Sequence, residues 1–167
     1  IHDTNRGISI MSELRTNRIV PRDGLPSGSS GGIIQIKQTV VTAATFTHNS
    51  ETPTLITGMT ATITPTRSDS KVLVSMDVST TVSAANYTTM FFIYKDGSVV
   101  SGARGDAGES NQIRAFKAVR HSGDNVQQTT SGMHLDSPGT TSAITYQIYV
   151  AQESGSTVYL NKTTSNA

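Results

Sequence analysis

Residues 144–150 read Ile144-Thr145-Tyr146-Gln147-Ile148-Tyr149-Val150. Successive side chains of a β-strand point to opposite faces of its sheet, so every second residue of this run shares a face. Ile144, Tyr146, Ile148 and Val150 form one apolar face, and the run predicts a strand packed against a core. The turn-forming residues 137–140 before it predict a reversal from an earlier strand.

A second stretch predicts a β-hairpin. The apolar run 90–94 leads into Lys95-Asp96-Gly97-Ser98, and residues 99–100 return as Val-Val. An Asp-Gly pair supplies the positive φ angles that a two-residue hairpin turn requires. We therefore expect antiparallel strands on both sides of Asp96 and Gly97.

The same two-residue period recurs along the chain. It predicts further strands over residues 33–40, from Phe46, and over 55–63, 71–78, about 112–120, 126–135 and 157–161. In 33–40 one face would carry Ile34, Ile36, Gln38 and Val40, so the folded domain is expected to begin at Ile33. Gly58 predicts a β-bulge inside 55–63.

The predicted fold class is all-β. About eight or nine short strands at this spacing favour an antiparallel β-sandwich of jelly-roll type. Residues 1–32 lack the period and contain many Gly, Ser and Pro residues, which predicts an extended N-terminal arm and linker before a 33–167 sandwich domain.

The arm is interpreted as an attachment segment. Its apolar residues stand among arginines, which suits docking on another protein, although a disordered tail is the alternative. The candidate attachment residues are Leu14, Arg15, Arg18, Ile19, Val20, Arg22 and Leu25.

Composition excludes several classes of function. The chain has no cysteine, and 13 basic and 12 acidic residues leave a net charge of +1, so we expect no disulfide, no thiolate chemistry and no nucleic-acid partner. No apolar run reaches the length of a membrane span, so no membrane insertion is expected. His2, His48, His121 and His134 lack ligand spacing, so neither a metal nor a cofactor is predicted.

The sequence predicts a protein without catalytic activity. It contains no nucleophile elbow, phosphate-binding loop or dinucleotide fingerprint. Several aspartates that could pair for glycoside cleavage fall in predicted turns. A polysaccharide-cleaving spike fragment is the remaining enzymatic hypothesis.

Three stretches are predicted to be exposed loops that contact other molecules: 84–88, 101–111 and 121–125. The candidate contact residues are Tyr87, Arg104, Asp106, Glu109, His121 and Asp124. The five tyrosines could stack on sugars, but their alternating positions favour packing in the core or at a subunit interface.

A collinear series of segments resembles one family. The series comprises 11–14, 17–20, 32–38, 63–65, 70–74, 94–97, 135–146 and 157–161, of which Asp136-Ser137-Pro138 followed by Ser142-Ala143-Ile144-Thr145-Tyr146 is the most specific. These segments resemble small virion proteins of tailed bacteriophages, notably of marine and cyanobacterial hosts. The resemblance implies a tail fibre, head fibre or capsid decoration subunit that usually trimerises and attaches through its N-terminal segment.

Two departures from that family affect the expectation. Ten residues precede Met11, and the chain ends where one more strand is expected, so a neighbouring subunit would supply it or the sequence would be incomplete. We predict a homotrimer on the virion surface, extracellular after release, that contacts other capsid or tail proteins and host glycan. The alternative is a carbohydrate-binding module of a cell-surface or secreted protein.

Overall fold

The computed structural model describes residues 33–42, 46–105 and 113–162. The chain divides into two compact units, Ile1–Ile36 and Lys37–Ala167, and every described strand belongs to the second. The strands are β1 (Thr47–His48), β2 (Thr54–Ile63), β3 (Val72–Val82), β4 (Thr88–Lys95), β5 (Ser98–Val99), β6 (Lys117–Arg120), β7 (Gln128–Asp136), β8 (Ile144–Gln152) and β9 (Val158–Leu160).

The described residues confirm the all-β class. Apart from a 3-10 turn, η1 (Ser101–Ala103), they contain no helical segment. Accordingly, none of them belongs to a helix that is long and apolar enough to cross a bilayer.

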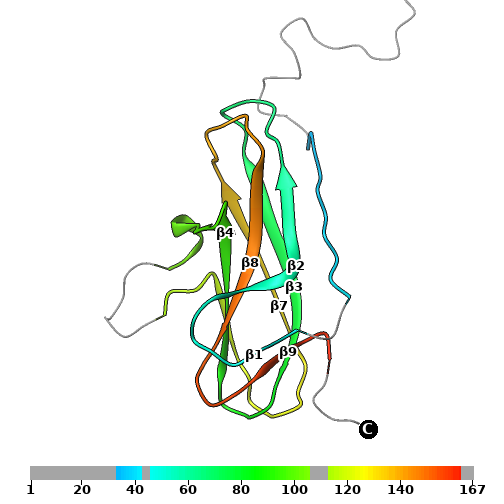
Figure 1. Ribbon diagram of the computed structural model, residues 1–167, viewed down its shortest axis with the longest axis vertical. Helices are drawn as coiled ribbons and strands as arrows, with labels where there is room; N and C mark the ends of the chain where they lie inside the picture. Colours follow the sequence, from blue (N-terminus) through cyan, green and yellow to red (C-terminus); the bar gives the residue numbers. More distant parts are fainter. Residues whose placement is uncertain (1–32, 43–45, 106–112, 163–167) are drawn as a thin grey trace, which may run out of the picture. The chain divides into compact units, whose positions relative to one another are not determined.

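The strands form two antiparallel sheets that pack as a β-sandwich (Figure 1). The sheet here called sheet A has the order β1-β9-β3-β7, and sheet B has the order β2-β8-β4-β5, with β6 pairing β4 beside β5. The pairing is nested: β1 pairs β9, β2 pairs β8, β3 pairs β7 and β4 pairs β6. Strands distant in sequence are therefore neighbours, and the fold depends on long-range pairing.

The core lies between the inner faces of the two sheets. Residues of β2, β3, β4, β8 and β9 supply it, and the predicted apolar face of residues 144–150 is buried as expected. Phe91 and Val150 lie opposite each other on β4 and β8, and both are fully buried. Full burial of side chains of this size stabilises a fold by about 2 kcal/mol each.

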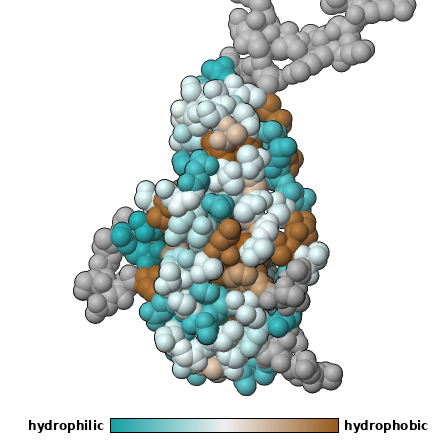
Figure 2. All heavy atoms as spheres, viewed as in Figure 1, coloured by the Kyte–Doolittle hydropathy of each residue, from teal (hydrophilic) through white to brown (hydrophobic). Residues whose placement is uncertain are grey.

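A smaller apolar cluster lies on the outer face of sheet B. Met90, Phe92 and Ala151 are buried there, with Tyr94 and Tyr149 packed against them. Strand β4 is therefore covered on both faces, which explains why residues 90–94 are continuously apolar. On the face shown in Figure 2, hydrophobic residues reach the surface as separate islands among hydrophilic ones.

The predicted turn and bulge are confirmed. Asp96 and Gly97 have φ angles of 48° and 79° and connect β4 to β5. Gly58 has a φ angle of 87°, and the β2–β8 register shifts between Leu55 and Thr60. A positive φ angle is available to glycine without the steric cost that a side chain would add.

The predicted strand over 33–40 is wrong. None of the described residues 33–42 has strand pairing, and Ile34, Ile36 and Val40 of the predicted shared face are exposed. Thr39 instead donates its Oγ1 hydroxyl to the Thr60 carbonyl oxygen at 2.6 Å. A side-chain contact of this kind fixes a segment without forming a backbone ladder, so alternation alone did not produce a strand.

The strand expected over about 112–120 is shorter in the structure. Strand β6 contains only Lys117–Arg120, while the described residues 113–116 lie outside it. The side chains of Phe116 and Lys117 lie against Gly132 of β7, where an added Cβ would come within 2.7 Å and 2.6 Å of them. The side chain of Phe116, the residue just before β6, thus packs on the other sheet.

Candidate functional site

Two of the three predicted contact loops meet at one end of the sandwich. The backbone N–H of Asn86 donates to the His121 carbonyl at 2.7 Å, and the N–H of His121 donates to the Tyr87 carbonyl at 3.0 Å. Arg104 follows η1 in the third loop and is half-buried. Asp106 and Glu109 lie outside the described residues, as do the candidate attachment residues of the arm.

His121 is not an exposed contact residue, which corrects that prediction. Its side chain is fully buried, with Nε2 3.3 Å from the Thr89 hydroxyl oxygen. Thr89 donates to the Gln152 Oε1 atom at 2.6 Å. Burial lowers the pKa of His121 below its ordinary value, because an imidazolium loses solvation there, and this outweighs a hydrogen bond to the Val126 backbone. A neutral, buried imidazole cannot recognise an external partner.

The other candidates in these loops differ in accessibility. Asp124 is exposed, whereas Tyr87 is half-buried. An added Cβ on Gly155 would lie 2.6 Å from the Tyr87 hydroxyl oxygen, so the Tyr87 ring packs directly on the Gly155 backbone. Of the two, Asp124 is the one available to a partner.

The tyrosines do not form one surface. Tyr146 is buried in the core, and Tyr94 and Tyr149 stack on each other with ring centroids 3.8 Å apart. The ammonium of Lys162 lies 4.7 Å from the Tyr159 ring centroid. The tyrosines therefore pack in separate places and do not form a common surface on which a sugar could stack.

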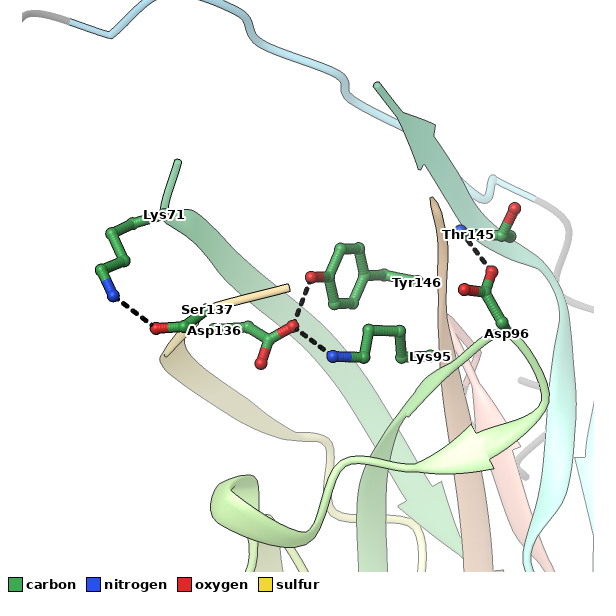
Figure 3. Close-up of polar contacts among 7 residues, drawn as sticks. All are labelled: Lys71, Lys95, Asp96, Asp136, Ser137, Thr145 and Tyr146. Carbon is green, nitrogen blue, oxygen red and sulfur yellow. Dashed lines mark hydrogen bonds and ion pairs between the residues drawn. The ribbon is translucent and has the colours of Figure 1, made fainter. Parts of the chain in front are cut away.

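A polar cluster joins the two sheets near the β4–β5 hairpin (Figure 3). Asp136 of β7 accepts hydrogen bonds at Oδ2 from the Tyr146 hydroxyl of β8 at 2.6 Å and from Lys95 Nζ of β4 at 2.9 Å. Beside it, Lys71 Nζ donates to Ser137 Oγ at 2.7 Å. One carboxylate of sheet A is therefore held by two strands of sheet B.

The cluster stabilises an ionised carboxylate. Burial by itself would raise the pKa of Asp136, but hydrogen bonds from Tyr146 and Lys95 and the charge of Lys95 outweigh burial and lower that pKa. Burial and the Asp136 carboxylate raise the pKa of Tyr146, so its hydroxyl stays protonated and continues to donate. Asp136 is thus an acceptor at neutral pH and is poorly suited to donate a proton.

A surface hollow of about 430 Å³ opens beside this cluster, between the end of β7 and the segment from Lys95 to Gly102. Its volume falls in the range of small-molecule sites. Its polar lining consists of Lys95, Ser98, Ser101, His134, Asp136 and Ser137. The arrangement can offer hydrogen-bond donors and acceptors to one small polar ligand.

Sequence reasoning did not identify Lys95, Asp136 and Tyr146 as a site. It placed Lys95 and Asp136 at turns and Tyr146 in a strand. The sequence did contain a signal for the position of Lys95. Alternation places Lys95 on the same face of its strand as Thr89, Phe91 and Ile93, so its side chain points between the sheets. A buried charge needs a partner, but the pairing of the sheets decides which residue supplies it.

Within the described parts of the chain, no three His, Cys, Asp or Glu side chains are grouped so that they could hold a metal ion. No protein-family model, curated protein or solved structure that was compared with the chain matches it.

Proposed function

We propose that this chain is a non-enzymatic structural subunit of a tailed-phage virion, either a tail or head fibre or a capsid decoration protein. Its N-terminal arm attaches to the particle, and its sandwich projects outward. The resemblance of its collinear segments to small virion proteins supports this proposal. The nested strand pairing supports jelly-roll topology, in which an antiparallel ribbon is rolled into two sheets.

One surface feature carries the assembly part of the proposal. Leu73 of β3 and Leu135 of β7 lie opposite each other on the outer face of sheet A, and Met133 is one outward-facing position further along β7. Their exposed fractions are 60%, 58% and 69%. Adjacent large apolar side chains in water mark a contact with another molecule. We refer to these three residues as the apolar row.

The proposed occupant of the apolar row is a second copy of this chain. Its neighbours on the same face are Ser75 and Ser131, which are small and let another sheet face approach closely, and the exposed Asp77 opposite Ser131. A trimer would bury the row in each subunit and display three sandwiches together. Several weak contacts on one rigid assembly raise the effective affinity for a host surface.

The mass of the full chain in solution tests this assembly. Light scattering should give the mass of a trimer, and the double variant Leu73→Thr/Met133→Thr should shift it to the monomer. Threonine keeps a strand-forming side chain while removing the apolar surface. Ile113→Thr, which changes an exposed apolar residue outside the row, is the matched control and should remain trimeric.

A monomeric wild-type chain would contradict trimerisation and favour the carbohydrate-binding module. The location can be tested separately with gold-labelled antibodies against the chain, viewed by electron microscopy. Labelling of phage heads or tails supports the virion proposal. Labelling of cell surfaces alone contradicts it.

A further inference from the structure

The hollow beside Asp136 combines functional groups that no single strand provides. Strand β7 and the residue after it contribute His134, Asp136 and Ser137, while the hairpin and η1 contribute Ser98 and Ser101. Because the Lys95–Asp136 pair links the sheets at 2.9 Å, the two walls are held in register before any ligand arrives. Preorganised polar groups bind a small ligand with little ordering cost.

The hydrogen-bonding capacity of the hollow suits a polyol. Tyr146 and Lys95 both bind Oδ2 of Asp136, and no described side chain donates to its Oδ1 atom (Figure 3). Lys95 uses one ammonium proton for Asp136 and has two more to donate. Serine hydroxyls both donate and accept, as the hydroxyls of a sugar do.

Apolar residues complete the lining. Val99 lies on the hairpin side of the hollow and Leu135 on the β7 side, whereas Val100, which also lines it, is buried in the core. A pyranose ring presents C–H groups on its faces and hydroxyls at its edge, so it needs both kinds of surface. The volume of about 430 Å³ accommodates one such ring.

We propose that this hollow binds one neutral hexose unit of a host-surface saccharide, with Asp136 Oδ1 and Lys95 Nζ engaging neighbouring hydroxyls. Lys95 balances the charge of Asp136, so the pair offers donors and acceptors to a neutral sugar without requiring a charged ligand. This inference rests on the adhesive part of the proposed function and assigns that role to a site.

Gly102 allows the hollow to be filled without disturbing the cluster. An added Cβ there would lie 3.7 Å from His134 Cε1, which is ordinary contact, so Gly102→Leu should place its side chain against the lining. Gly105→Leu is the matched control, because an added Cβ at Gly105 meets no atom within 4 Å. Circular dichroism of both variants verifies that they remain folded.

The test is an NMR titration of the full chain with glucose, galactose, mannose and N-acetylglucosamine, and with glucuronic acid for comparison. Saturable shifts with a neutral sugar, weakened by about tenfold or more in Gly102→Leu but not in Gly105→Leu, support the site. Three results overturn it: no saturable shift with any neutral sugar, binding of the acid alone, or binding that Gly102→Leu leaves unchanged. None of them alters the trimer mass or the particle labelling, so the two proposals fail independently.

Discussion

Asp136 on β7 and Lys95 on β4 form an ion pair of 2.9 Å that connects the two sheets of the sandwich. Their side chains are only 12% and 31% exposed, so the pair is shielded from solvent more than a surface pair is. The Tyr146 hydroxyl binds the same carboxylate oxygen. The contact therefore stabilises the packing of one sheet on the other, and it also forms one wall of the hollow.

Removal of the carboxylate should loosen this connection. We expect Asp136→Ala to lower the free energy of unfolding by about 2–4 kcal/mol, because Lys95 and Tyr146 lose their shared acceptor. Urea unfolding of the full chain measures the change. Asp69→Ala is the control, since its pair with Arg67 is highly exposed and should contribute little. Equal effects of the two variants would contradict a role for Asp136 between the sheets.

Acid should weaken the same contact. The folded state lowers the pKa of Asp136 below its ordinary value of 3.8, so the carboxylate binds a proton more readily in the unfolded chain. Its contribution is therefore present above about pH 4 and is lost as the pH falls through the folded-state pKa. Unfolding measured between pH 5 and pH 2 should show a shallower decline for Asp136→Asn than for the wild type.

His121 should produce a second, separate pH dependence. Burial lowers its pKa below the ordinary 6.5, so the unfolded chain gains a proton first as the solution is acidified. The stability contributed by neutral His121 is present above pH 6.5 and declines below it. When the free energy of unfolding is measured against pH, His121→Gln should remove its decline between pH 7 and pH 5. The decline at lower pH, which Asp136 causes, should remain. A profile unchanged by the substitution would show that His121 does not titrate differently on folding.

Gly155 is expected to be intolerant of any side chain. Its φ angle is +103°, and an added Cβ would lie 2.6 Å from the Tyr87 hydroxyl oxygen, so Gly155→Ala adds both backbone strain and a clash. We expect a loss of about 2–4 kcal/mol in the free energy of unfolding. Gly139→Ala separates the two causes, because its φ angle is also positive but an added Cβ meets no atom within 4 Å. It should cost about 1 kcal/mol.

Alternation and turn chemistry were enough to predict most strands. The apolar face of residues 144–150, the Asp96-Gly97 hairpin and the Gly58 bulge depend on side-chain period and on φ angles that neighbouring residues determine. These are local properties, and they also identified the all-β class. The same local pattern over residues 33–40 produced no strand, because strand formation further requires a partner edge.

Tertiary structure alone decided the remaining features. Nested pairing places Lys95, Asp136 and Tyr146 together although 41 residues separate Lys95 from Asp136. It also buries His121, which lies in a polar stretch that reads as an exposed loop. Side-chain burial and the pairing of polar side chains depend on contacts between strands that are distant in the chain. A local sequence period therefore cannot predict them. The amino-acid order by itself thus determined where the chain extends and turns, while the packing of the two sheets decided which charges meet and where the hollow forms.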